Sequence, residues 1–115
     1  ALALAPAARV VAAEHAWLAP LPPEGASAIM FRDTAHAPQL AQAQGIRSAD
    51  LLANGIVDVV VPEPADAASD PDTFTANLAA ALDHSLRSVM ALPRSERLRR
   101  RHARYRNLGA QRVVS

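Results

Sequence analysis

The chain has 115 residues, which predicts one domain or part of one. It contains no Cys, which excludes disulfides and thiolate metal sites, and it has no apolar run long enough to predict a membrane-spanning segment. Half of the residues are apolar, but only 3% are aromatic and 27 are Ala, so we expect a small, tight core with close helix packing.

Charge is unevenly distributed along the chain, although the net charge is only +1 and there is no Lys. Residues 1–93 hold 4 Arg and 10 acidic residues, a net charge of −6, whereas residues 94–115 hold 8 Arg and 1 acidic residue, a net charge of +7. The chain opens ALALAPAARVVAA, without the basic segment of a signal peptide. That opening reads as the middle of a helix, so we expect a fragment of a longer protein or a mature chain whose start is missing.

The first part of the chain predicts a helix end, a strand and a proline-rich loop. Residues 1–8 are typical of a helix that ends near Pro6. Residues 9–17 predict a buried strand, because two Val are followed by small residues and a Trp. The loop of residues 18–25, LAPLPPEG, holds three of the nine prolines.

Three helices and a strand are predicted next. Residues 24–33 form the first helix, with Pro23 in its opening turn, where the missing N–H costs nothing. The second helix runs from Thr34 as N-cap to Gly45, and the third from Ser48 to the Asn54–Gly55 pair. The run IVDVVV, Ile56–Val61, predicts a strand.

The last part of the chain predicts two helices. Asp70 as N-cap and Pro71 at the first position begin the longer one, and Pro93 ends it. The final helix is predicted from Ser95 as N-cap to Gly109. The order of these elements predicts an α/β fold that is too short to complete a sheet. Apolar residues recur every four positions along the longer helix, as one stripe: Phe74, Leu78, Leu82, Leu86 and Met90.

No familiar catalytic or metal-binding motif is present. No Ser lies in a G-x-S-x-G turn, and no two His have the spacing of a zinc site. We therefore predict no metal site and no catalytic triad. The four histidines are interpreted as surface groups or hydrogen-bonded interior groups: His15, His36, His84 and His102.

The seven arginines between Arg94 and Arg106 allow two interpretations. They could bind phosphates, either of nucleic acid or of a cofactor. Alternatively, they belong to a solvated helix that pairs with acidic residues of a partner subunit. We favour the second, because Tyr105 is the only aromatic residue among them.

Gly25 is the glycine without an obvious place at a helix end. It lies in the first turn of a predicted helix, where a missing side chain lets another group approach the free backbone amides. A simple packing requirement explains it equally well.

Four stretches between residues 1 and 64 occur in the order and spacing of one known family: ALAL, EHAW followed by PEGAS, RDTAHAP, and DLLANGIVDVVVPEP. Together they resemble the carboxyltransferase component of biotin-dependent acyl-CoA carboxylases. The likeness is greatest to the C-terminal part of the acetyl-CoA carboxylase carboxyltransferase alpha subunit. After PEP the chain reads ADAAS, where that subunit has two glycines and a histidine; this is more like carboxyltransferases that carry both halves in one chain.

The resemblance implies a partial crotonase-like (ClpP/crotonase) spiral of β-β-α turns over residues 1–64, followed by a C-terminal helical extension over residues 65–115. It implies transfer of CO₂ from carboxybiotin, held on a biotin carboxyl carrier protein, to acetyl-CoA. The product would be malonyl-CoA for fatty acid synthesis. A cytoplasmic oligomer with a second carboxyltransferase module is implied, without nucleic acid or membrane.

The resemblance also implies site residues. The backbone amide of Ala1 would donate to an oxyanion. Pro23, Glu24, Gly25 and Ala26 would wall the pocket for biotin or for the acyl group. Two alternatives stay open: another crotonase-type acyl-CoA enzyme, a hydratase or isomerase with Glu24 as its acid, and a non-catalytic interaction module with an Arg-rich helix.

Overall fold

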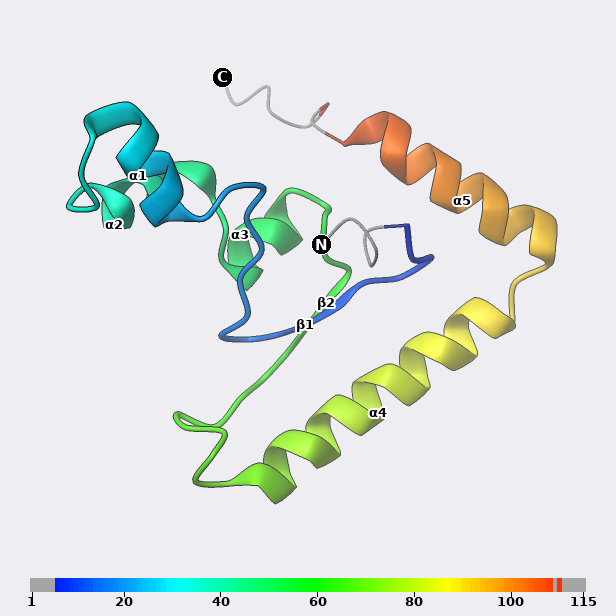
Figure 1. Cartoon of the computed structure of the whole chain (residues 1–115). Coiled ribbons are helices and arrows are strands. Elements are labelled where there is room, and N and C mark those ends of the chain that lie inside the picture. Colours follow the sequence, from blue (N-terminus) through cyan, green and yellow to red (C-terminus); the bar gives the residue numbers. More distant parts are fainter. Residues whose placement is uncertain (1–5, 109, 111–115) are drawn as a thin grey trace.

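The computed structural model describes residues 6–108 and 110 (Figure 1). Over these residues the chain is a mixed α/β protein, as predicted, with helices around a short parallel sheet. Ala1, whose amide is predicted to donate to an oxyanion, and most of the helix predicted for residues 1–8 lie outside the described residues. The elements are β1 (Val11–Ala13), α1 (Pro23–Phe31), α2 (Ala37–Gln44), α3 (Ser48–Ala53), β2 (Val59–Val61), α4 (Pro71–Met90) and α5 (Arg94–Asn107).

The sheet pairs β1 with β2 in parallel, with Val11 opposite Val59 and Ala13 opposite Val61. Parallel neighbours need a long crossover, and here α1, α2 and α3 supply it. Both strands are shorter than predicted. The strand predicted for residues 9–17 ends at Ala13, because the chain turns and the Ala16 amide donates to the Ala13 carbonyl oxygen at 3.0 Å.

The strand predicted to begin at Ile56 begins only at Val59. The amides of Ile56 and Val57 both donate to the Leu51 carbonyl oxygen, at 2.9 and 3.2 Å, so these residues close the end of α3 instead. Gly55 makes this turn possible with a φ of 70°, which confirms its predicted place after the helix. The helix end therefore uses backbone groups that a longer strand would need.

Two predicted helix starts were wrong. The N-cap of α2 is His36 rather than Thr34, because Thr34 lies in a tight turn in which the Asp33 carboxylate accepts a hydrogen bond from the Ala35 amide at 2.9 Å. The N-cap of α5 is Pro93 rather than Ser95, because the Pro93 carbonyl oxygen already accepts from Arg97 at 3.0 Å. Gly109, the predicted end of the last helix, lies outside the described residues.

The core is small, as the alanine content predicts. Its buried apolar side chains come from the crossover helices, from the residues beside them and from β2. Ser27 and Ser48 are buried among them. The buried apolar residues are Ala26, Ala37, Ile46, Leu51, Val57 and Val61.

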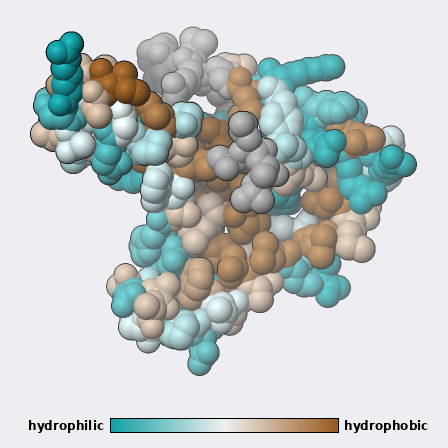
Figure 2. All heavy atoms as spheres, viewed as in Figure 1, coloured by the Kyte–Doolittle hydropathy of each residue, from teal (hydrophilic) through white to brown (hydrophobic). Residues whose placement is uncertain are grey.

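The start of α4 matches the prediction, since the Asp70 carboxylate accepts from the Thr73 amide at 3.2 Å and Pro71 follows it. The apolar stripe behaves differently along its length. Four residues turn an α-helix by about 400°, so a strict four-residue repeat winds about 40° further at each step. The first half of the stripe is partly buried, whereas Leu82, Leu86 and Met90 are 50%, 60% and 67% exposed. Figure 2 shows hydrophobic residues gathered along α4.

Helix α5 is joined to the sheet region through Arg104. This guanidinium forms an ion pair with the Asp58 carboxylate at 2.8 Å and donates to the Ile56 carbonyl oxygen at 2.7 Å. The same Asp58 oxygen accepts from the Val10 amide at 2.6 Å, just before β1. The Arg104 side chain is only 13% exposed. A charged group therefore connects the C-terminal half of α5 to the beginnings of both strands.

Candidate functional site

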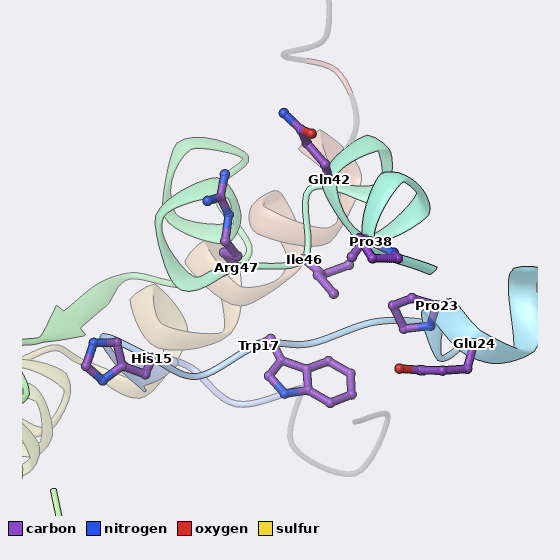
Figure 3. Close-up of a pocket in the computed structure, with 9 residues that line it drawn as sticks. His15, Trp17, Pro23, Glu24, Pro38, Gln42, Ile46 and Arg47 are labelled. Atoms are coloured by element: carbon purple, nitrogen blue, oxygen red, sulfur yellow. The ribbon is translucent and has the colours of Figure 1, made fainter. Parts of the chain in front are cut away.

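A pocket of about 650 Å³ lies beside the carboxyl end of β1, where α1, α2 and the α2–α3 link come together (Figure 3). In parallel α/β folds ligands bind outside the carboxyl ends of strands. In the view of Figure 3, Trp17 lies between His15 and Glu24, and the side chain of Arg47 points away from the indole. The lining residues are His15, Trp17, Pro23, Glu24, Pro38, Ala41, Gln42, Ile46 and Arg47.

The segment that carries Trp17 is fixed by backbone pairing with the α2–α3 link. Trp17 and Arg47 form an antiparallel bridge, and the Leu18 amide donates to the Ile46 carbonyl oxygen at 2.9 Å. The Ser48 amide donates to the Ala16 carbonyl oxygen at 3.1 Å. Because these bonds join residues about 30 positions apart, they hold one wall of the pocket against the other.

The prolines fix where α1 begins at the rim. Pro22 is the N-cap and Pro23 the first helical residue, and the Pro22 carbonyl oxygen accepts from the Ala26 amide at 2.9 Å. Their restricted φ leaves the chain little freedom to move the helix start. The acidic side chain of Glu24 lies in the first turn, which suits the positive end of the helix dipole.

Of the four residues predicted to wall a pocket, two line this one. Pro23 and Glu24 face it, whereas Gly25 and Ala26 are not among its lining residues. Ala26 is buried in the core. A Cβ on Gly25 would meet Leu21 Cδ1 at 3.6 Å, an ordinary van der Waals distance, so packing within the described residues does not require a glycine there.

Sequence reasoning missed the pocket residues His15, Trp17 and Arg47, although EHAW was one of the quoted stretches. The Glu63 carboxylate accepts a hydrogen bond from the backbone amide of His15 at 2.6 Å and lies 3.5 Å from the Nδ1 atom of the His15 ring. In return, the Glu14 carboxylate accepts from the Glu63 amide at 3.0 Å. The partners are 48 and 49 positions apart, and only the parallel pairing of β1 with β2 brings them together.

The other histidines fit the interpretation as surface or hydrogen-bonded groups. His36 stacks on Phe31 with ring centroids 4.0 Å apart, and its Nδ1 lies 3.0 Å from Asp33. That hydrogen bond is the main reason why the pKa of Asp33 is lowered. His84 and His102 are exposed. Within residues 6–108 and 110, no three His, Asp or Glu side chains gather closely enough to hold a metal ion.

Glu96, the acidic residue of α5, accepts hydrogen bonds from two arginines of the same helix. Glu96 lies 2.6 Å from Arg99 Nη2 and 2.6 Å from Arg100 Nε. Hydrogen bonds from Arg99 and then Arg100 lower the pKa of Glu96 from 4.5 to about 2. The hydrogen bond that Arg99 donates to Glu96 also raises the pKa of Arg99.

The described residues thus define an α/β protein whose pocket is bounded by a proline-led helix start and a strand end. The chain belongs to the acetyl co-enzyme A carboxylase carboxyltransferase-like family, whose model matches residues 1–109. This confirms the resemblance found in the motifs. No helix that the structure describes is both long and apolar enough to cross a membrane.

Similar proteins carry names of the same kind. The chain is 59% identical over 112 residues to the probable biotin-dependent acyl-coenzyme A carboxylase beta3 subunit of Mycobacterium tuberculosis, across 97% of this chain and 23% of that protein. It is 44% identical over 110 residues to the acetyl-coenzyme A carboxylase carboxyl transferase subunit alpha of Thermosynechococcus vestitus, across 95% of this chain and 34% of that protein.

The name of a third relative joins the beta and alpha subunits in one protein. The acetyl-coenzyme A carboxylase carboxyl transferase subunits beta/alpha of Salinispora tropica is 46% identical over 112 residues, across 96% of this chain and 20% of that protein. The chain therefore spans only a fifth to a third of the length of these relatives.

Proposed function

We propose that the full-length protein containing this chain is the carboxyltransferase component of a biotin-dependent acyl-CoA carboxylase. The observation that carries the proposal is the family match over residues 1–109, together with relatives named for acetyl-CoA and acyl-CoA carboxylases. In the reaction, carboxybiotin would give up its carboxyl group to the α-carbon of the thioester, and the proton that this carbon loses would end on the biotin nitrogen. Acetyl-CoA would give malonyl-CoA for fatty acid synthesis.

The family resemblance extends this proposal to the fold and the assembly. Residues 1–64 would complete part of a crotonase-like spiral, and residues 65–115 would form a helical extension beside it. A second carboxyltransferase module, an acyl-CoA and a biotin carboxyl carrier protein would be the partners, in the cytoplasm. The short sheet supports the proposed spiral. A parallel sheet of two strands with three residues each is marginally stable by itself, so further strands from the rest of the protein would complete it.

The residues present fit a site that binds polar carbonyl groups through backbone amides. Pro23 has no N–H, and no hydrogen bond is found for the Glu24 and Gly25 amides within the described part of the chain. At a helix N-terminus such amides stabilise a negatively charged oxygen. Carboxybiotin would supply the carboxyl group, and Pro23, Glu24, Gly25 and Ala26 would wall its pocket or that of the acyl group. The Ala1 amide would be a further oxyanion donor.

Gly25 gives this part of the proposal a clean test. Since a Cβ at this position meets only Leu21 at 3.6 Å, Gly25→Ala leaves the described packing intact, and Gly25→Val adds bulk at the helix start. We expect Gly25→Val to raise KM for biotin or acyl-CoA, and Gly25→Ala to do so more weakly, with unchanged folding. Unchanged Michaelis constants in a folded Gly25→Val protein would remove these residues from the pocket.

The activity itself is tested with the full-length protein and malonyl-CoA. We expect acetyl-CoA to form at a rate that depends on added biotin derivative, and we expect no hydration of an enoyl-CoA. Hydration without biotin-dependent turnover would favour the hydratase alternative, in which Glu24 is the acidic residue at the pocket. Comparing malonyl-CoA with methylmalonyl-CoA then separates an acetyl-CoA enzyme from one that prefers a longer acyl group.

A further inference from the structure

A second hollow lies between the segment that leads into β1 and the C-terminal half of α4, and its volume is about 400 Å³. It shares no lining residue with the pocket beside the carboxyl end of β1. Its size falls within the range of sites that bind small organic molecules. Seven of its nine lining residues are Ala, Val or Leu, and the other two are Arg9 and Ser85. The hollow is therefore an apolar site with one cation and one hydroxyl group.

Ser85 has a hydroxyl group that its own helix does not use. A Ser or Thr inside a helix commonly donates a hydrogen bond to the carbonyl oxygen four residues earlier. In α4, Thr75 donates in this way to Pro71 at 2.8 Å, and Ser88 donates to His84 at 2.7 Å. Ser85 is only 5% exposed, yet its Oγ atom has no hydrogen-bond partner among the residues that the structure describes. Because a buried hydroxyl group without a partner is unfavourable, a polar group in the hollow would stabilise it.

Arg9 brings a positive charge to the same hollow. The residue is half-buried, and its Nε atom is buried without a hydrogen-bond partner in the described part of the chain. The ion pairs found there do not include Arg9, and no acidic residue lines the hollow. A guanidinium group matches the geometry of a carboxylate. Two buried polar groups that lack partners thus lie on one otherwise apolar wall.

We propose that this hollow binds an aliphatic carboxylate. The carboxylate would accept hydrogen bonds from Arg9 and Ser85, and the aliphatic chain would lie against the apolar residues. Leu82 and Leu86 are 50% and 60% exposed, so the hollow is open to water along this side and a chain can enter there. Since both polar atoms are shielded from water in the structure, binding requires their side chains to turn toward the ligand, a change between staggered torsions.

The charge of the hollow favours a carboxylate over other head groups. One guanidinium and one hydroxyl group match a single negative charge, whereas a phosphate carries more charge and needs more donors. An uncharged apolar molecule would leave Arg9 and Ser85 without partners. Because the hollow is separate from the pocket beside β1, this site does not depend on the proposed carboxyltransferase activity.

The test is calorimetric titration of the full-length protein with octanoate. We expect saturable binding that Arg9→Met weakens about tenfold or more, because hydrogen bonds to charged groups are the stronger ones. Arg87→Met is the matched control, since Arg87 is exposed on α4 and pairs with Asp83; it should change the affinity less than about twofold. Ser85→Ala should weaken binding about threefold, and Ser88→Ala should leave it unchanged.

Two further measurements place the ligand without any variant. Octanoate should slow amide hydrogen exchange in peptides that span residues 7–11 and 82–89, and octanol, which lacks the charge, should bind about tenfold more weakly than octanoate. No saturable binding of octanoate, equal binding of octanol, or equal effects of Arg9→Met and Arg87→Met would overturn the proposal. Tighter binding of octyl phosphate than of octanoate would also overturn it, because the head group would then be a phosphate.

Discussion

Replacing Arg104 with Met should release α5 from the sheet region. The Met side chain keeps much of the aliphatic stem but removes the ion pair with Asp58 at 2.8 Å and the hydrogen bond to Ile56 at 2.7 Å. Hydrogen bonds to charged groups contribute about 1.5–3 kcal/mol each when buried. Asp58 is 34% exposed, so water solvates the carboxylate once its partner is gone. We therefore expect a loss of about 2 kcal/mol, below the 3–5 kcal/mol typical of a fully buried pair.

The assay is amide hydrogen exchange, followed by mass spectrometry on peptides from α5 in the full-length protein. A helix of 14 residues is barely stable alone in water, so its amides exchange once it detaches. A loss of about 2 kcal/mol corresponds to roughly 30-fold faster exchange when opening is at equilibrium. Arg99→Met is the matched control, because it removes only an exposed pair and should change exchange less than about twofold. Equal protection of α5 in the two variants would refute the reasoning.

Three further outcomes are expected, each followed by reversible denaturation. Asp70→Ala removes the acceptor of the Thr73 amide and should cost about 1 kcal/mol, whereas Asp70→Asn should cost much less; equal losses would contradict an N-cap role. Gly45→Ala places a side chain at a φ of 60° and should cost about 1 kcal/mol, so an unchanged stability would show that the position relaxes. Glu96, whose pKa is lowered to about 2, should stabilise α5 above about pH 4.5 and lose this effect as the pH falls toward 2. Glu96→Gln should abolish that part of the loss of stability in acid. An acid denaturation profile that Glu96→Gln leaves unaltered would contradict a stabilising role of Glu96.

Features that depend on a few adjacent residues could be predicted. Asp70 followed by Pro71 fixed the start of α4, and Gly45, with a φ of 60°, ends α2 where expected. In each case the residue itself supplies the acceptor or the backbone conformation. Thr34 failed as an N-cap because the neighbouring Asp33 organises a competing turn. Such competition among adjacent polar residues is hard to read from propensity alone.

Features that depend on distant partners could not be predicted. Strand β1 stops at Ala13, where the chain turns and the Ala16 amide donates to the Ala13 carbonyl oxygen, and its partner β2 is itself only three residues long. Nothing in residues 9–17 shows either feature. The winding of the α4 stripe, by contrast, could have been predicted, because its four-residue repeat is visible in the sequence. A repeat of four against 3.6 residues per turn predicts that Met90 turns away from the side on which Phe74 lies.

The family resemblance named Pro23 and Glu24 as walls of a binding pocket, and both line the pocket beside β1. Their role in holding biotin or the acyl group stays a prediction. His15 and Arg47 reach the same pocket only through the pairing of two segments about 30 residues apart. The roles proposed for Ala1, Gly25 and Ala26 remain predictions that come from the family resemblance.

Transfer of a labelled carboxyl group is the measurement that tests the proposed activity most directly. The full-length protein would be incubated with malonyl-CoA labelled in its free carboxyl group and with a biotin derivative. We expect the label to appear on the biotin derivative, with one acetyl-CoA formed for each carboxyl group transferred. Release of all the label as CO₂ at a rate independent of the biotin derivative, or no turnover at all, would contradict a carboxyltransferase.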